Sequence, residues 1–150
     1  MKKELTISAI KDGTVIDHIP SNATFKVADI LDLKGIKSMV SVATNLPSKQ
    51  IGKKGIVKIE GKYLTQEEVN KIAIAAPQAT VNIIENYDVK KKLKVSIPNQ
   101  ISRVIKCSNP NCITNVEKIE TRFSVLDKNP LKIRCHYCER DMNKEDIEIV

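Results

Sequence analysis

Four cysteines in the last third of the chain are the residues whose types and spacing most clearly indicate chemistry. Four residues separate Cys107 from Cys112, two separate Cys135 from Cys138, and twenty-two lie between the pairs. Two close pairs of cysteines, brought together by a short antiparallel hairpin between them, can hold a tetrahedral metal ion, and this spacing is typical of zinc sites. Four thiolates close the coordination shell, so we predict one structural Zn²⁺ with no open position for a substrate. His136, between two ligands, is predicted to be a neighbour of the metal rather than a ligand.

Two disulfides or four buried thiols are the alternatives to a metal. No apolar stretch follows Met1 to Glu4, so no secretory signal is expected and disulfides are disfavoured. A unit of about 50 residues with little apolar content has a marginal core, which a bound metal would stabilise. No apolar run reaches the ~18 residues that a membrane span needs. We therefore expect a cytoplasmic protein that carries zinc and has no membrane partner.

The charge balance indicates an anionic partner for the first two-thirds of the chain. The formal net charge is +7; residues 1–100 hold 16 basic and 10 acidic groups, and residues 101–150 hold 9 and 8. An excess of this kind favours phosphate, nucleic acid or an acidic protein face, although a lysine-rich solvated surface would look the same. The chain has no phosphate-binding glycine loop, no dinucleotide fingerprint and no G-x-S-x-G motif, which argues against an enzyme.

Two groups of residues could bind an anion. Asp17 and His18 could hydrogen-bond a sugar or a base, or could simply form a satisfied turn. Lys54 and Lys58 are four residues apart, so on one continuous strand they share a face. A run of lysines at 90–94 adds a second basic cluster, for which the alternative is an edge strand protected by charge.

Hydrophobic periodicity predicts the elements that position these residues. Period-two alternation predicts four strands, at 5–10, 39–43, 55–60 and 80–85. Helical spacing predicts helices at 22–33 and 65–76, the second beginning with the capping box Thr65 to Glu68. The order β-α-β-β-α-β is typical of the ferredoxin-like split βαβ fold, an antiparallel sheet with both helices on one face, and 93–95 could add an edge strand.

A change of pattern near residues 96–100 predicts a second domain. Beyond it the chain reads as short strands separated by turns, at 103–106, 116–120, 122–126, 131–134 and 147–149. The predicted class is therefore α+β, with a ferredoxin-like domain over 1–97 and a small all-β four-cysteine zinc domain over 101–150.

Four segments together resemble a known family. They are 13–20 (GTVIDHIP), 45–48 (NLPS), 76–82 (APQATVN) and the cysteine quartet, followed by Glu139. In this order they resemble the regulatory chain of aspartate carbamoyltransferase, over essentially all 150 residues. The resemblance implies a non-catalytic chain of pyrimidine biosynthesis that binds ATP and CTP, with UTP as a further candidate. It also implies a homodimer whose zinc domain docks on the catalytic chain.

The resemblance implies a nucleotide site and one partner contact. The first-strand residues would meet the base, Asp17 and His18 the ribose and phosphate side, and Lys92 a phosphate. The full set of matched positions is Ile7, Ser8, Ala9, Ile10, Asp17, His18, Lys54, Lys58, Asn82, Ile84, Tyr87, Val89 and Lys92. Asn111, inside the first cysteine loop, would contact the catalytic chain. Ser8 and the last dozen residues depart from the family pattern.

A zinc-ribbon protein that binds nucleic acid is the alternative function, suggested by a pI of about 9.2 and the four cysteines. Such a ribbon needs basic residues interleaved with aromatic ones. Residues 101–150 are nearly neutral, with Phe123 and Tyr137 as their aromatic residues. We therefore expect no nucleic-acid partner.

Overall fold

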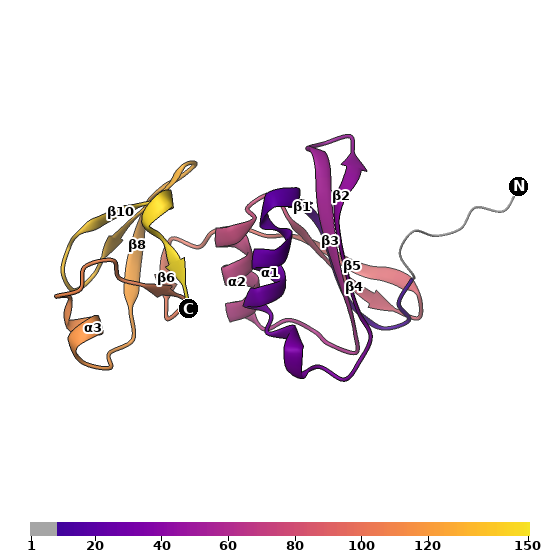
Figure 1. The fold of residues 1–150 in the computed structure, drawn as a ribbon, viewed down its shortest axis with the longest axis horizontal. Helices are drawn as coiled ribbons and strands as arrows, with labels where there is room; N and C mark the ends of the chain where they lie inside the picture. Colours follow the sequence, from indigo (N-terminus) through magenta and orange to yellow (C-terminus); the bar gives the residue numbers. More distant parts are fainter. Residues whose placement is uncertain (1–8) are drawn as a thin grey trace, which may run out of the picture. The chain divides into compact units, whose positions relative to one another are not determined.

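The computed structural model describes residues 9–150, and the chain divides into two compact units between Val95 and Ser96. The first unit is built on one sheet and two helices (Figure 1), and the second, Ser96–Val150, holds the four cysteines. Within the described part of the chain, no helix is long and apolar enough to cross a membrane.

A five-stranded antiparallel sheet forms the first unit, in the order β2-β3-β1-β4-β5. Its strands are β1 (Gly13–Pro20), β2 (Val40–Ser48), β3 (Gly52–Glu60), β4 (Thr80–Glu85) and β5 (Asp88–Lys94). The helices α1 (Thr24–Ile30) and α2 (Gln66–Ala75) both lie against one face of this sheet (Figure 1).

Alternation along the strands separates the two faces of this sheet. Ile16 pairs with Val57 on β3 and Val81 on β4, and all three side chains are buried on the helix side. Successive strand residues point to opposite faces, so the neighbours of these three residues face away from the helices. We call that second surface the open face; its residues include Val15, Asp17, Lys54, Lys58, Asn82, Ile84 and Lys92.

The first strand of the sheet differs from the prediction. Residues 5–8 of the expected strand at 5–10 lie outside the described residues, and Ala9 and Ile10 belong to no strand. The strand β1 begins instead at Gly13, beyond the end of the predicted strand. Gly13 has φ of 143°, and a Cβ there would overlap the carbonyl oxygen of Ile59, so glycine is the residue that fits this first position of β1 without a shift of the backbone.

The first helix is shorter than predicted, whereas the second agrees closely. Instead of 22–33, α1 covers Thr24–Ile30 and is flanked by the 3₁₀ turns η1 (Ser21–Ala23) and η2 (Leu33–Gly35). Asp32 adopts a left-handed conformation (φ 48°), which ends the helical run.

The predicted capping box of α2 is confirmed. The hydroxyl of Thr65 accepts a bond from the Glu68 backbone N–H (3.2 Å), and the Glu68 carboxylate accepts one from the Thr65 N–H (3.0 Å). Burial opposes ionisation of Glu68, but these contacts and Lys62, 3.3 Å away, lower its pKa below the ordinary value.

The second unit is a four-stranded antiparallel sheet in the order β10-β9-β8-β6, with a separate strand pair. The sheet strands are β6 (Gln100–Ser102), β8 (Arg122–Lys128), β9 (Leu131–Cys135) and β10 (Asp141–Asn143). The pair consists of β7 (Ile105–Lys106) and β11 (Glu148–Ile149), which follows the 3₁₀ turn η3 (Lys144–Asp146). Phe123, Ile133 and Met142 are almost completely buried and form the centre of its small core.

This unit is mostly sheet, but the all-β prediction was wrong in one place. The one-turn helix α3 (Ile113–Val116) overlaps the start of the strand predicted at 116–120, a segment in which the structure has no strand. Backbone N–H groups of Asn115 and Val116 both donate to the Cys112 carbonyl, at 2.8 and 3.1 Å. Val116 is 68% exposed, so burial of its side chain does not hold this segment extended.

Candidate metal centre and anion-binding surface

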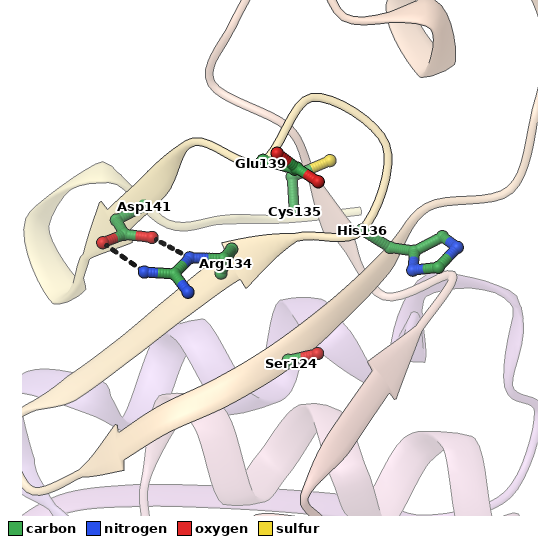
Figure 2. Close-up of a pocket in the computed structure, with 6 residues that line it drawn as sticks. All are labelled: Ser124, Arg134, Cys135, His136, Glu139 and Asp141. Atoms are coloured by element: carbon green, nitrogen blue, oxygen red, sulfur yellow. Dashed lines mark hydrogen bonds and ion pairs between the residues drawn. The ribbon is translucent and has the colours of Figure 1, made fainter.

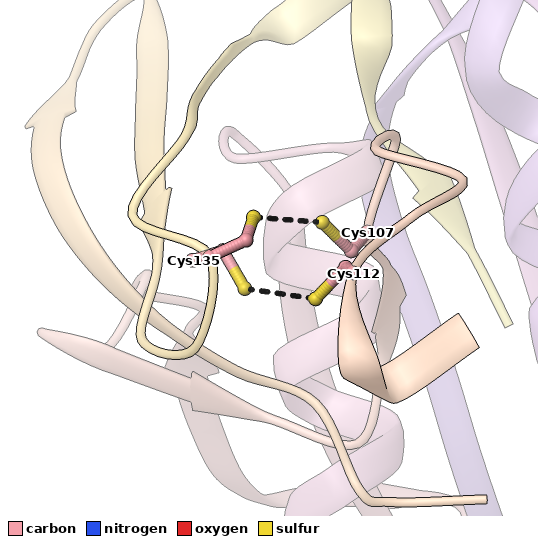
Figure 3. A group of neighbouring side chains, drawn as sticks. Cys107, Cys112 and Cys135 are labelled. Carbon is pink, nitrogen blue, oxygen red and sulfur yellow. Dashed lines mark hydrogen bonds between the residues drawn. The ribbon is translucent and has the colours of Figure 1, made fainter. Parts of the chain in front are cut away.

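The four cysteines of the second unit form a cluster that fits a tetrahedral metal. Their sulfur atoms all lie within 4.8 Å of one another, and the sulfurs of Cys107 and Cys138 are 3.7 Å apart. Those of Cys112 and Cys135 are also 3.7 Å apart (Figure 3). Zinc bound at about 2.3 Å from each sulfur requires sulfur–sulfur distances of about 3.8 Å. A disulfide would need about 2.05 Å, so the cysteines are free thiols in metal-binding positions.

Two tight turns aim the sulfurs inward. Cys107 directly follows β7 and Cys112 directly precedes α3, with the Asn109 carbonyl accepting from the Cys112 N–H at 3.0 Å. Cys135 ends β9, and its carbonyl accepts from the N–H of Glu139, at 3.0 Å. Glu139 has φ of 61°, a left-handed conformation that lets the chain reverse beside Cys138.

The thiols differ in how readily they ionise. Burial raises the pKa of the Cys107 thiol to about 12 and also raises that of Cys135. Burial acts on Cys138 as well, but hydrogen bonds, first from the Arg140 backbone and then from Asn109, lower its pKa to about 7. Metal binding requires thiolates, so the ion must displace protons that burial holds on Cys107 and Cys135.

A polar pocket of about 540 Å³ lies beside this cluster. Ser124, Arg134, His136, Glu139 and Asp141 line it together with Cys135 (Figure 2). Arg134 and Asp141 form a two-bond ion pair, at 2.7 and 3.3 Å, which raises the pKa of the arginine and lowers that of the aspartate. His136 is exposed and is not part of the metal-binding group found among the described residues, which consists of the four cysteines.

The open face of the first unit brings three predicted site residues into one row. Lys58 on β3 pairs with Val15 on β1, which pairs with Asn82 on β4, which pairs with Lys92 on β5. Directly paired residues share a face, and at about 4.8 Å per strand the row from Lys58 to Lys92 spans about 14 Å. Asn82 is 92% buried, and its side-chain amide donates to the Val15 carbonyl at 3.3 Å. This hydrogen bond holds the Asn82 side chain in place at the middle of the row.

A second polar group adjoins this row two residues further along β1. The Asp17 carboxylate contacts Lys54 Nζ at 2.9 Å and accepts from the His18 backbone N–H at 2.6 Å. His18 has φ of 57°, at an irregularity in the β1–β3 register, and its Nδ1 lies 3.0 Å from the hydroxyl of Thr80. The structure therefore brings Asp17, His18 and Lys54 together. The polar groups of Asp17 and His18 already have hydrogen-bond partners within the chain, as the alternative interpretation expected.

The register also separates the lysines of β5. Lys90 pairs with Glu85 at 3.2 Å, whereas Lys91 lies opposite Ile83 and so faces away from the row. Lys92 and Lys94 lie opposite Asn82 and Thr80, on the open face. Of these lysines, only Lys92 and Lys94 are therefore placed to contact a ligand on the open face. The charges of all four lysines protect the edge strand β5 from pairing with another chain.

The remaining predicted site residues are spread over several segments of the chain. Ile84 is buried and opposite Val89, which is exposed. Tyr87 is exposed in the β4–β5 turn with φ of 69°, and its N–H donates to the Lys11 carbonyl at 2.8 Å. Ile10 is buried and Ala9 exposed, whereas Ile7 and Ser8 lie outside the described residues. Asn111 is exposed in the Cys107–Cys112 loop.

Comparison with known proteins assigns both units. The family model for the allosteric domain of the aspartate carbamoyltransferase regulatory chain matches residues 5–96, and the model for the metal-binding domain of the same chain matches residues 99–148. The chain belongs to the aspartate carbamoyltransferase regulatory chain family.

Full-length relatives agree with this assignment. The regulatory chain of Pyrococcus horikoshii is 59% identical over 146 residues, which cover 96% of each chain. Those of Thermococcus kodakarensis and Bacteroides fragilis are 51% and 45% identical and cover 98% and 99% of this chain, and 97% of their own length. A regulatory chain is not the catalytic chain, and the prediction of a non-enzymatic member of a pyrimidine biosynthesis complex is confirmed. The zinc-ribbon nucleic-acid alternative is not favoured.

Sequence reasoning missed two residues of this regulatory chain's open face. Val15 bridges Lys58 and Asn82, and Thr80 contacts His18. The signal for Val15 was its alternation with Asp17, but no strand was predicted over 13–20.

Proposed function

We propose that the open face of the first unit binds a nucleoside triphosphate, with ATP and CTP as effectors and UTP as a further candidate. The observation that carries this proposal is the row from Lys58 through Asn82 to Lys92, beside the group formed by Asp17, His18 and Lys54. Lysines at the two ends suit the charge of a triphosphate, while an amide and a carboxylate suit a base and a ribose. The full proposed set is the thirteen residues that the family resemblance implies.

The effector is proposed to act on a separate catalytic chain through linkage. Its binding can alter a distant active site only if it binds two states of the assembly with different affinity. The coupling must then be reciprocal, so that a substrate analogue on the catalytic chain shifts nucleotide affinity by the same factor.

The test is nucleotide affinity in the assembled complex, with and without a bisubstrate analogue. We expect the two affinities to differ by roughly 5–150-fold for at least one of ATP and CTP, the usual range of allosteric coupling. Equal affinities for both nucleotides would contradict the regulatory mechanism, even in a chain that binds nucleotides well.

Residues 1–97 are proposed to be the allosteric domain and 101–150 the docking domain. The element order from β1 to β4 and the strand order β2-β3-β1-β4 support a ferredoxin-like topology, to which β5 adds an edge. We assign one structural Zn²⁺ to Cys107, Cys112, Cys135 and Cys138 because of their spacing and sulfur–sulfur distances. Free thiols held for a metal also favour the reducing cytoplasm.

Asn111 is proposed to contact the catalytic chain. It is exposed, and its backbone N–H donates to the side-chain oxygen of Asn109 at 3.1 Å, which fixes it on the turn between two zinc ligands. We expect Asn111→Ala to weaken binding of the catalytic chain by about fivefold or more, while nucleotide affinity of the isolated chain is unchanged. Sedimentation of mixed chains measures this, with the exposed loop residue Ser108→Ala as control. Unchanged assembly together with an unchanged effector response would exclude Asn111.

A homodimer is proposed through the first unit. The strand β2 lies at an edge of the sheet, and Met39, just before it, and Val42, within it, have exposed apolar side chains. An unpaired apolar edge is a site for pairing with another chain. We expect sedimentation equilibrium to give the mass of two chains; a monomer at micromolar concentration would exclude this pairing.

A further inference from the structure

The first cysteine loop is tied to α3 by one side chain. The amide nitrogen Nδ2 of Asn115 donates to the Cys107 carbonyl at 2.9 Å and to the Asn109 carbonyl at 2.7 Å. The Asn115 backbone N–H donates to the carbonyl of Cys112 at 2.8 Å. This half-buried residue therefore contacts the first residue, the middle and the last residue of the Cys107–Cys112 loop.

These contacts bear on the two sulfurs of that loop. Cys107 follows a strand of only two residues and Cys112 precedes a helix of only four, so neither element is long enough to fix the loop alone. The carbonyl groups that Asn115 binds belong to the peptide units beside Cys107 and to the turn that closes on Cys112. Without the amide, the Cys107 carbonyl loses this donor, the Asn109 carbonyl keeps the Cys112 N–H as donor, and the spacing of the two thiols is less restrained.

We propose that Asn115 is a positioning residue for the metal centre, which holds Cys107 and Cys112 at the separation that a tetrahedral ion requires. Asn115 supplies no ligand atom; it acts through the backbone of the ligands, as partners behind a metal's ligands commonly do. This inference rests on the proposed zinc occupancy of the four cysteines and is independent of the nucleotide site.

Two substitutions separate donation from packing. Asn115→Ala removes both hydrogen bonds and the side-chain volume. Asn115→Asp keeps the shape but replaces the donating amide with a group that, when ionised, can only accept, and places it against two carbonyl oxygens. If Asn115 acts by donating hydrogen bonds, the aspartate variant should bind zinc more weakly than the alanine variant. If Asn115 merely fills space, the aspartate variant should bind zinc as the wild type does.

The experiment measures zinc affinity of the full-length chain by competition with a chromophoric chelator. We expect Asn115→Ala to weaken zinc binding by about 10–100-fold, Asn115→Asp to weaken it further, and Ser108→Ala in the same loop to change it less than about twofold. An aspartate variant that binds zinc as tightly as the wild type, or more tightly than Asn115→Ala, would overturn the proposal.

Cobalt binding supplies a second measurement that does not depend on affinity. At saturating Co²⁺ the Asn115→Ala chain should keep the absorption spectrum of a four-thiolate tetrahedral site, because Asn115 is not a ligand. A spectrum with fewer thiolates, or failure of the alanine variant to bind any metal, would overturn the positioning role. If the wild-type chain itself binds no zinc, the proposed metal centre fails instead.

Discussion

Removing the metal is expected to unfold residues 96–150 while the first unit stays folded. Structural zinc contributes on the order of 10 kcal/mol, whereas a core as small as this one supplies roughly 3–5 kcal/mol. The Cys138→Ser chain should show the same behaviour, because three thiolates leave the coordination shell incomplete. The catalytic chain should then be released, since the proposed docking residue Asn111 lies between Cys107 and Cys112, two of the four clustered cysteines.

Hydrogen exchange measured by mass spectrometry can follow the two units separately. After chelation, peptides from the second unit should lose protection, and peptides from β1 to β5 should keep it. The matched control is His136→Ala, which changes an exposed neighbour of Cys135 outside the cysteine group and should keep its zinc. Much less than one zinc per chain in freshly purified assembled protein, or continued protection after chelation, would contradict this prediction.

Nucleotide affinity should fall when either end of the open-face row is neutralised. Lys58→Ala and Lys92→Ala are each expected to weaken ATP and CTP binding by about 1.5–3 kcal/mol, the size of a lost charge-assisted hydrogen bond. This corresponds to roughly 10- to 150-fold in the dissociation constant. Added salt should weaken wild-type binding as well, because part of the attraction is screened.

The control for this prediction comes from the same strand. Lys91→Ala removes an equal charge one residue away, but Lys91 lies opposite Ile83 on the other side of the pleat. Calorimetry should find its affinity close to that of the wild type. If all three variants lose affinity equally, the loss comes from the change in net charge and not from a site on the open face. If Lys58→Ala and Lys92→Ala keep the wild-type affinity, the nucleotide site lies elsewhere.

The clustering of the four cysteines could be predicted from sequence, because their spacing alone is typical of one metal-binding group. The structure then brought the four sulfurs to distances that suit a tetrahedral ion. The helix α3 could not be predicted, since four residues are too few for helical periodicity to appear. It forms because two N–H groups bond the Cys112 carbonyl, a local contact that leaves no hydrophobic pattern.

The set of residues on the open face was less predictable, because it depends on how neighbouring strands are aligned in the sheet. Alternation indicates that Lys54 and Lys58 share a face, but no single-strand pattern shows that Lys92 and not Lys91 lies opposite Asn82. That alignment depends on an irregularity between Ile83 and Ile84, where β5 holds one extra residue. The left-handed conformation of His18 is equally invisible in the sequence, because histidine seldom adopts it.

The close packing of α1 on β3 has a consequence for how this surface can vary among related chains. Gly55 adjoins Lys54 on β3, and a Cβ there would overlap the side chain of Thr24, the fully buried first residue of α1. Any larger residue at position 55 must push the helix away or shift the backbone that carries Lys54. Mutational tolerance is therefore unequal across this sheet: a side chain at position 55 needs such a shift, whereas the side chains at positions 58 and 92 point away from the helices and can change without disturbing this contact.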